Sequence, residues 1–298
     1  MRALVIGASG QLGGHLLSQL RAGGHLCVGT FATSPAEGLV RLTLDDDAAV
    51  AAALADVRPE VVLLPAGWTW VDGNEDDPAR SLRQNRDEPQ RLARRCRDAG
   101  ALFVTFSTDY VFDGAAGPYG EDDPPRPLSV YGRAKLEAEE ALRAEVPEHL
   151  NLRTTTVFGP ERQGKNFVYQ VLRRAAKGER MVVPSDQWAT PSYGPDVASA
   201  TLALVEQGAR GTWNVGGPDL LDRAEFARRA CHVFGFDPDV VVEPRTTAEL
   251  KQKAARPLRG GLRTDKLRGA GITLRGAEEA LRAMKAELEA GRGAPIAP

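Results

Sequence analysis

Three side chains in the middle of the chain form a set that could transfer a proton. They are Thr108, Tyr131 and Lys135. Tyr131 and Lys135 are four residues apart, so on a helix they project from the same face. A neighbouring cation favours the phenolate and lowers a tyrosine pKa from its ordinary value of about 10. The spacing therefore predicts a proton donor and acceptor for carbonyl–alcohol chemistry near neutral pH.

A glycine-rich turn near the N-terminus supports this interpretation, because a Tyr-x-x-x-Lys pair alone also arises by chance on amphipathic helices. Residues 2–6 form a short apolar run that is typical of a buried parallel strand. Gly7, Gly10 and Gly13 follow it, and the turn opens into a helical pattern over residues 11–22. Glycines at such a turn let the backbone approach a pyrophosphate, and the helix N-terminus supplies free amides. This order predicts a dinucleotide site rather than a plain glycine-rich connection.

The composition is that of a soluble globular protein. The 298 residues are 42% hydrophobic and 26% charged, which suits one large domain or one domain with a smaller partner. A net charge of -2 gives no electrostatic case for binding nucleic acid or an anionic membrane. Cys27, Cys96 and Cys231 lie far apart and the four histidines form no cluster, so neither disulfides nor a metal site is predicted. The first apolar run breaks at Gly7 and no stretch approaches the roughly 20 apolar residues of a membrane span, so we expect a cytoplasmic protein.

Strand-like runs alternate with helical patterns through the first two-thirds of the chain. The predicted strands are residues 2–6, 26–29, 39–42, 61–64, 102–106 and 150–153. The predicted helices are residues 11–22, 46–55, 79–99, 130–146 and 196–206. This alternation predicts an α/β fold with a doubly wound parallel (Rossmann) sheet. Ligands bind such sheets beyond the carboxyl ends of the strands, so Gly7, Ala66 and Thr108 should meet at one edge.

The pattern loosens after residue 153 and predicts a second, smaller domain. Its expected helices are residues 167–177, 222–234 and 278–290, and its expected strands are residues 181–183 and 240–242. Residues 211–216 read as a strand that rejoins the main sheet, and the tail after Gly291 is expected to fray. We therefore assign residues 1–154 and 189–215 to a dinucleotide-binding domain, and residues 155–188 and 216–298 to a discontinuous α/β substrate domain.

Together these motifs resemble the extended short-chain dehydrogenases/reductases, and within them the dTDP-4-dehydrorhamnose reductases. The likeness covers nearly the whole chain. Its most specific segments are Ser-Thr-Asp-Tyr-Val-Phe at 107–112, Pro-Leu-Ser-Val-Tyr-Gly-x-x-Lys at 127–135 and Asp-Gln-Trp-Ala-Thr-Pro at 186–191. Lys165-Asn166-Phe167, Arg256-Pro257 and residues 68–72 fall where the family has further motifs.

The resemblance implies NAD(P)H-dependent reduction of the 4-keto group of a nucleotide-linked deoxysugar, most specifically of dTDP-4-dehydrorhamnose to dTDP-L-rhamnose. In this chemistry Tyr131 protonates the C4 carbonyl oxygen, Lys135 tunes Tyr131 and holds the nicotinamide ribose, and Thr108 hydrogen-bonds the reacting oxygen. The implied cofactor contacts are Gly7, Ser9, Gly10, Gln11, Leu12, Gly13, Thr30, Ala66, Gly67, Tyr131 and Lys135. The implied substrate contacts are Asp109, Tyr110, Thr156, Asn166, Gln187, Trp188 and Arg256. The structural alternatives are a turn-capping role for Asp109 and a core position for Tyr110.

The chain departs from the family pattern on two sides of the expected pocket. It has Leu64-Pro65-Ala66 where Asn-Ala-Ala is common, and it has Thr156 where these reductases often place a substrate-contacting Trp. The loss of that indole reshapes the pocket and leaves the exact sugar open. Trp68, Trp70 and Trp188 are candidates to refill the space, although a Trp near a pocket is as often packing as recognition.

Cofactor choice is partly legible after the second predicted strand. Residues 30–34 contain no carboxylate that would repel a 2′-phosphate and no Arg that would attract one. We therefore favour NADP(H) over NAD(H) and leave dual use open. Residues 79–99 and 132–146 are candidates for the helix-pair interface of a homodimer, an arrangement common in this superfamily.

Two other functions stay open. A non-catalytic NADP-binding regulatory subunit is the first, because the beta subunit of methionine adenosyltransferase shares the Ser-x-Asp-Tyr-Val-Phe-Asp-Gly and Tyr-x-x-x-Lys features. A nucleotide-sugar epimerase or dehydratase on the same scaffold is the second. A dehydratase normally needs further acid/base carboxylates beside the hydroxyl at the end of the fifth strand, and only Asp109 follows Thr108 here.

Overall fold

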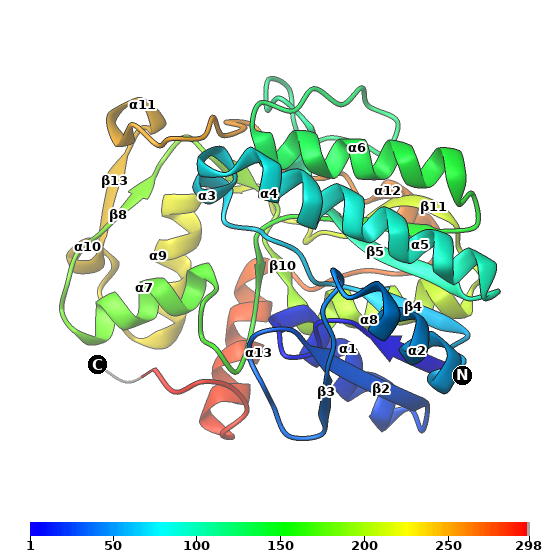
Figure 1. Cartoon of the computed structure of the whole chain (residues 1–298). Coiled ribbons are helices and arrows are strands. Elements are labelled where there is room, and N and C mark those ends of the chain that lie inside the picture. Colours follow the sequence, from blue (N-terminus) through cyan, green and yellow to red (C-terminus); the bar gives the residue numbers. More distant parts are fainter. Residues whose placement is uncertain (297–298) are drawn as a thin grey trace.

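A seven-stranded parallel sheet forms the centre of the computed structural model, which describes residues 1–296 (Figure 1). The strands run in the order β11-β6-β5-β4-β1-β2-β3. Their bounds are β1 Arg2–Val5, β2 Leu26–Phe31, β3 Leu39–Arg41, β4 Val61–Leu64, β5 Leu102–Thr108, β6 Leu150–Thr154 and β11 Gly211–Asn214. The strand order reverses beside β1 and β4, which is where open parallel sheets bind ligands. The predicted doubly wound fold is confirmed.

Helices cover both faces of this sheet. α1 (Gln11–Ala22) and α8 (Gly194–Glu206) pack on one face, and α2 (Asp47–Val57), α5 (Glu88–Asp98) and α6 (Val130–Glu145) pack on the other (Figure 1). Alternate residues of one strand enter the two cores, as Leu4 and Val5 do. Burial on both faces explains why the strands read as continuous apolar runs in the sequence.

A second body lies beside the sheet, on the left in Figure 1. It contains two parallel strands, β8 (Met181–Pro184) and β13 (Val242–Arg245). Its helices include α7 (Phe167–Ala176), α9 (Arg223–Phe234), α10 (Pro238–Val241) and α13 (Ala277–Glu289). Tyr169, Phe226 and Met284 are buried together in its core. Four short strands form two further pairs: β7 (Val157–Phe158) with β10 (Ser192–Tyr193), and β9 (Trp188–Ala189) with β12 (Leu221–Asp222).

The largest departure from the predicted elements lies in residues 79–99, which do not form one helix. α4 (Pro78–Leu82) is followed by a π-helical turn, Arg83–Asp87, and only then by α5. Pro89 lies in the first turn of α5, where its missing N–H is tolerated. The extra residue of a π turn redirects the chain, and here it buries Asn85. An unpredicted helix, α3 (Val71–Asp76), precedes this segment.

The C-terminal third also differs from the prediction. Residues 240–241 end α10 rather than begin a strand. Leu267, in α12 (Asp265–Gly269), and Leu274 pack in the core of the large sheet, although the prediction groups them with the substrate domain. Ala294 is buried and its amide donates to the carbonyl oxygen of Glu161 (2.7 Å), so the tail is fixed at this point.

The division of the chain into two domains stays a prediction. The last two residues of the predicted substrate domain, 297 and 298, lie outside the described residues. α11 (Thr247–Leu250) completes the helices of the second body. Within residues 1–296, every helix is too short or too polar to cross a membrane.

Candidate active site

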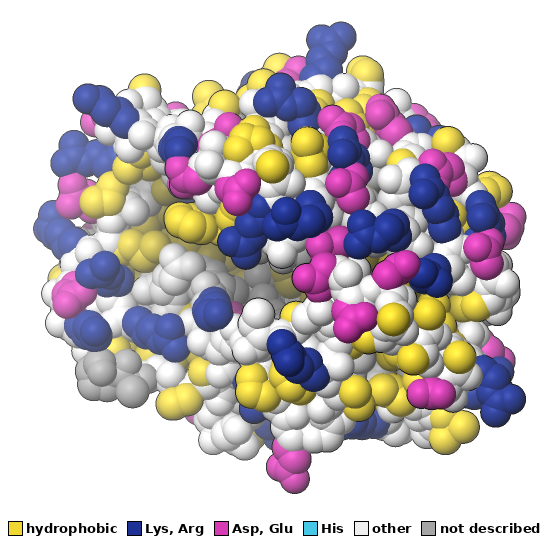
Figure 2. All heavy atoms as spheres, in the orientation of Figure 1, with side chains coloured by type: hydrophobic (Ala, Val, Ile, Leu, Met, Phe, Trp, Pro, Cys, Tyr) yellow, Lys and Arg dark blue, Asp and Glu magenta, His cyan; other side chains and the backbone are white. Residues whose placement is uncertain are grey.

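A cleft of about 620 Å³ opens at the carboxyl edge of the sheet and is closed on its far side by the second body. Figure 2 shows the hollow between the two bodies, with Lys and Arg side chains along its rim. The sheet side is lined by segments that follow β1, β4, β5 and β6. The predicted site residues in this lining are Gly10, Gln11, Leu12, Ala66, Gly67, Thr108, Asp109, Tyr110, Tyr131, Lys135, Thr156 and Asn166.

The glycine turn is shaped by close backbone approaches. Gly7 has a φ of +85°, a conformation that favours glycine. A side-chain carbon at Gly13 would collide with the carbonyl oxygen of Gly7, so the third glycine is also required. The amide of Ala8 donates to the carbonyl oxygen of Thr30 (2.7 Å) and the amide of Gly7 donates to its hydroxyl (3.3 Å). The Thr30 side chain therefore fixes the turn from behind; it is 2% exposed and lies outside the described cleft lining, and its contact with the cofactor stays a prediction.

Free donors point to a pyrophosphate at this turn. The side-chain nitrogen of Gln11 is buried at the start of α1 and has no hydrogen-bond partner within residues 1–296. The first amides of a helix and an unpaired amide nitrogen suit the oxygens of a phosphate. The carbonyl oxygen of Ser9 accepts from the Gln163 side chain (3.1 Å), so a loop of the second body reaches across to the turn. The residues present fit a dinucleotide.

The chain brings the three predicted catalytic side chains together. Tyr131 lies in the first turn of α6, which Ser129 caps by accepting from the amide of Gly132 (3.1 Å). A side chain at Gly132 would collide with the carbonyl oxygen of Tyr110, so glycine lets α6 approach the end of β5. Thr108 ends β5, and Thr108, Tyr131 and Lys135 are 7%, 8% and 8% exposed. All three side chains line the cleft.

Burial, rather than the lysine, dominates the titration of Tyr131. Burial raises the pKa of Tyr131 well above its ordinary value; the nearby Tyr110 and Asp109 add to the rise, and a hydrogen bond with Thr108 opposes it. The prediction that the pKa of Tyr131 is lowered by Lys135 is therefore wrong for this chain, because burial dominates the shift and Lys135 is not among the groups that act on this phenol. Burial lowers the pKa of Lys135 to about 8, and the charge of Glu139 opposes this. Near neutral pH the phenol holds its proton.

A buried ion pair supports the helix that carries Tyr131 and Lys135. Glu139 lies one turn beyond Lys135 and pairs with Arg153 at the end of β6 (2.6 Å), and both side chains are 2% exposed. Arg153 also donates to the carbonyl oxygen of Glu121 (3.1 Å). Buried charges are tolerated when paired and hydrogen-bonded in this way. The pair therefore fixes α6 against the sheet.

Asp109 connects three segments of the chain. Its carboxylate accepts hydrogen bonds from the Thr155 hydroxyl (2.7 Å), the Gly261 amide (3.1 Å) and the Thr108 hydroxyl (3.4 Å). Burial raises the pKa of Asp109, and these hydrogen bonds oppose the rise. Asp109 lines the cleft as predicted, but its oxygens already hold protein groups. Tyr110 lies beside it, with its ring 6.0 Å from that of Tyr131.

Four predicted substrate contacts either lie outside the cleft lining or are held by other protein groups. The Gln187 side chain donates to Thr247 (2.9 Å) and Gln252 (2.6 Å), and Arg256 pairs with Asp72 (3.0 Å). Trp188 is 38% exposed in β9, and these three residues lie outside the described cleft lining. Asn166 does line the cleft, yet its side chain caps α7 and donates to the carbonyl oxygen of Gly159 (2.8 Å). Backbone groups at the start of α7 therefore occupy the Asn166 side chain, whereas other side chains occupy Gln187 and Arg256.

Thr156 is strained at the position where the family often has Trp. Its φ is +42°, in the left-handed region that a β-branched residue rarely adopts. Such a conformation costs on the order of 1–3 kcal/mol and tends to occur at functional sites. Thr156 lines the cleft, whereas Trp68, Trp70 and Trp188 are not in the described lining. No indole therefore refills the space in the described part of the chain.

Sequence reasoning missed several residues of the lining. Asn85 reaches it through the π turn, and its side chain holds both the amide and the carbonyl of Trp68 (3.1 Å each). Gln163 comes from the loop before α7, as does Lys165, which lies within a family motif of the sequence but was not predicted as a site residue. Arg223 comes from the first turn of α9. A capping Asp222 before an amphipathic helix was the available signal for the last of these.

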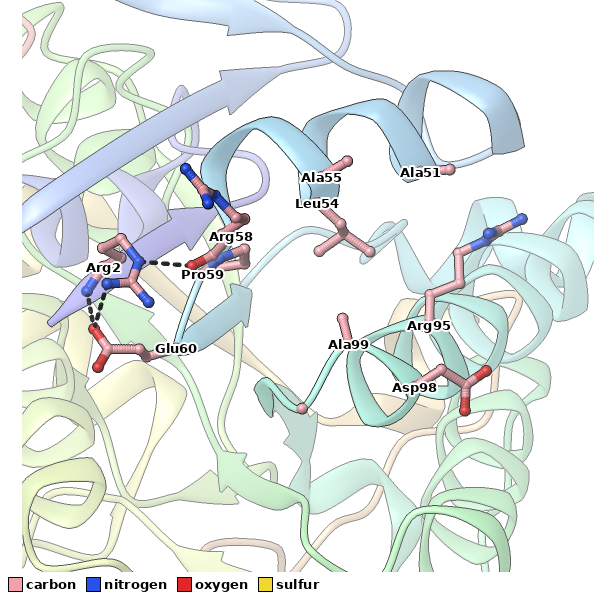
Figure 3. Close-up of a pocket in the computed structure, with 11 residues that line it drawn as sticks. Arg2, Ala51, Leu54, Ala55, Arg58, Pro59, Glu60, Arg95, Asp98 and Ala99 are labelled. Carbon is pink, nitrogen blue, oxygen red and sulfur yellow. Dashed lines mark hydrogen bonds and ion pairs between the residues drawn. The ribbon is translucent and has the colours of Figure 1, made fainter.

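A second hollow of about 650 Å³ lies away from the predicted residues, between α2 and α5 (Figure 3). Arg2, which opens β1, donates through its amide to Glu60 (2.6 Å) and through its guanidinium to the carbonyl oxygen of Arg58 (2.8 Å). Arg95 pairs with Asp47. None of the predicted site residues lines this groove. Within residues 1–296, no group of three or more His, Cys, Asp or Glu side chains could hold a metal ion.

Comparison with known proteins shows the family to which this chain belongs. A family model described as the RmlD substrate binding domain matches residues 1–290. The probable low-salt glycan biosynthesis reductase Agl14 of Haloferax volcanii is 34% identical over 276 residues, or 90% of this chain and 92% of that protein. The dTDP-4-dehydrorhamnose reductase of Streptomyces griseus is 35% identical over 281 residues, or 91% and 88%. The crystal structure of the Bacillus anthracis dTDP-4-dehydrorhamnose reductase in complex with NADP has a TM-score of 0.88 and 26% identity, covering 96% of this chain and 99% of that one. The resemblance seen in the motifs is confirmed, and the chain belongs to the RmlD substrate binding domain family.

Proposed function

We propose that this chain reduces the 4-keto group of a nucleotide-linked deoxysugar, with dTDP-4-dehydrorhamnose as the favoured substrate and dTDP-L-rhamnose as its product. The chain is an NAD(P)-dependent enzyme of the short-chain dehydrogenase/reductase type. The observation that carries the proposal is the meeting of Thr108, Tyr131 and Lys135 in one cleft with the glycine turn. When bound, the reduced nicotinamide supplies the hydride.

The side chains supply proton control. Tyr131 holds its proton near neutral pH because burial raises its pKa, so it can donate to the C4 oxygen as that oxygen gains negative charge. The Thr108 hydroxyl lies beside it and can hydrogen-bond the same oxygen. The Lys135 ammonium lies on the same face of α6 and lines the same cleft, where it can hold the nicotinamide ribose beside Tyr131.

The cofactor would lie along the glycine turn. The amides at the start of α1 and the Gln11 side chain suit its pyrophosphate, and Lys135 suits the nicotinamide ribose. We favour NADP(H) over NAD(H), because the segment after β2 has no carboxylate to repel a 2′-phosphate and because the Bacillus anthracis relative holds NADP. Michaelis constants for the two cofactors test this choice, and a strong preference for NADH would contradict it.

The sugar is the finer part of the proposal. A curated relative is named for dTDP-4-dehydrorhamnose reduction, and another is named for glycan biosynthesis. Thr156 widens the space where the family often has an indole. The test is a screen of dTDP-, UDP- and GDP-linked 4-ketosugars, followed by the loss of reduced-nicotinamide absorbance. Turnover of the dTDP-linked ketosugar supports the proposal. No turnover of any of them, together with a stable co-purifying enzyme, would favour a regulatory subunit instead.

A further inference from the structure

Arg223 is a cation of the cleft wall that forms no ion pair within the described residues, 1–296. It is the first residue of α9, it is partly buried, and it lines the cleft opposite the end of β5. Within residues 1–296 its guanidinium makes no hydrogen bond or ion pair with another side chain. Its backbone amide, by contrast, is held by the carbonyl oxygen of Gln187 (3.1 Å).

An aromatic ring fixes the position of this guanidinium. Its central carbon lies 5.0 Å from the centre of the Phe167 ring, and Phe167 in turn stacks on Phe226 at 5.9 Å. Arginine stacks on aromatic faces while keeping its N–H donors free at the edge. The stack therefore presents a preorganised donor fork to the cleft.

The charge of Arg223 reaches the catalytic side of the cleft. It acts to lower the pKa of both Asp109 and Tyr110. Asp109 is not its ion-pair partner, because the Asp109 oxygens are held by Thr155, Gly261 and Thr108. Other arginines at or near this face are neutralised, since Arg256 pairs with Asp72 and Arg153 with Glu139.

A nucleotide-linked sugar carries a diphosphate, which is an anion that the Arg223 guanidinium could bind. The C1 and C4 atoms lie at opposite ends of a pyranose ring, so a sugar with C4 at Tyr131 directs its C1 diphosphate away from the sheet. The wall it meets belongs to the second body, which presents Arg223 and Lys165. A planar guanidinium binds phosphate oxygens in a bidentate manner, whereas an ammonium acts as a point charge.

We propose that Arg223, oriented by Phe167, binds the diphosphate of the nucleotide-linked substrate, with Lys165 contributing from the same wall. This inference rests on the proposed function. Arg223 thereby selects a nucleotide-linked sugar over a free one, and it acts on substrate binding rather than on the proton transfer at Tyr131.

The test compares binding of dTDP and thymidine to the full chain by calorimetry, in wild type, Arg223→Gln and Arg223→Met. The Met variant keeps an aliphatic stem over Phe167 if the Gln variant is unstable. Loss of a charge-assisted hydrogen-bond pair should weaken dTDP binding about tenfold or more and leave thymidine binding unchanged. Arg228→Gln is the matched control, because Arg228 lies on the same helix but pairs with Asp239 (2.8 Å).

Equal dTDP affinity in wild type and in folded Arg223 variants would overturn the inference, as would an equal loss in the Arg228 variant. A wild type that binds no dTDP overturns it as well. A wild type that binds dTDP through Arg223 but reduces no ketosugar supports this inference and refutes the proposed function, so the two failures are distinguishable.

Discussion

The cleft at the carboxyl edge of the sheet and the groove between α2 and α5 have similar volumes, about 620 and 650 Å³. Their titratable side chains differ in exposure to solvent. In the cleft, Asp109, Tyr131 and Lys135 are 4%, 8% and 8% exposed, and burial shifts the pKa of each. In the groove, Arg2 and Glu60 are 50% and 54% exposed and lie 4.0 Å apart.

The volume of a hollow therefore does not identify an active site. Exposed ion pairs are solvated and contribute little to stability. The charged side chains of the groove are therefore screened by water. Buried titratable groups respond strongly to a bound ligand because water does not screen them. The cleft also lies where the strand order reverses, whereas the groove lies between α2 and α5 beside the first residue of β1.

The largest expected effect sharpens this contrast at the phenol. Tyr131→Phe removes the proton donor and should lower kcat by about 10²–10⁴-fold. Cofactor affinity should stay close to that of wild type, because the glycine turn is untouched. Turnover of ketosugar and fluorescence titration with reduced cofactor measure the two quantities. Near-normal turnover in this variant would falsify the assignment of Tyr131 as the donor.

The next effect concerns the buried pair beneath the cleft. Glu139→Gln leaves the Arg153 charge without its anion in a position that is 2% exposed. Breaking a buried pair in this way destabilises a protein by on the order of 3–5 kcal/mol. Urea denaturation of wild type and variant measures the change in the free energy of unfolding. The exposed pair Arg282–Glu278 supplies a control, since Glu278→Gln should change stability far less.

A smaller effect should appear in the pH dependence. Lys135 is charged below its pKa and neutral above it, so activity that needs the ammonium should decline as the pH rises through about 8. Glu139 raises this pKa, so Glu139→Gln should move the decline to lower pH. The readout is kcat/KM across the neutral and alkaline range at a temperature where the variant is folded. An unmoved alkaline limb would show that another group controls it.

The smallest effect is expected in the groove. Arg95→Ala removes the cation that pairs with Asp47 at the groove wall. Because this pair is exposed, kcat and KM should match those of wild type and the melting temperature should change little. Steady-state kinetics and a thermal melt of the two proteins check this. A tenfold loss of activity would break the contrast between the two hollows.

The fold could be predicted because its signals are local. Buried parallel strands must be apolar throughout, so β4 was predicted at its observed bounds, Val61–Leu64. The glycine turn could be predicted because only glycine permits the backbone geometry at Gly7 and Gly13. The proximity of Tyr131 and Lys135 could be predicted because residues four apart lie on one face of a helix.

The rest depends on contacts between distant segments. Arg256 and Asp72 are far apart in sequence, and nothing near Arg256 indicates that a carboxylate of α3 will engage it. The pKa of Tyr131 was predicted in the wrong direction because spacing shows the cation but not the depth of burial. The π turn that buries Asn85 was signalled only weakly, by Pro89 within a helical pattern.

The hydrogen bond from the Gly261 amide to Asp109 spans 152 positions of the sequence. A growing polypeptide therefore has β1 to β6, and both Thr108 and Tyr131, well before it has the donor that holds Asp109. All seven strands of the large sheet, the last of which ends at Asn214, are therefore synthesised before the amide that holds Asp109 in the reaction centre.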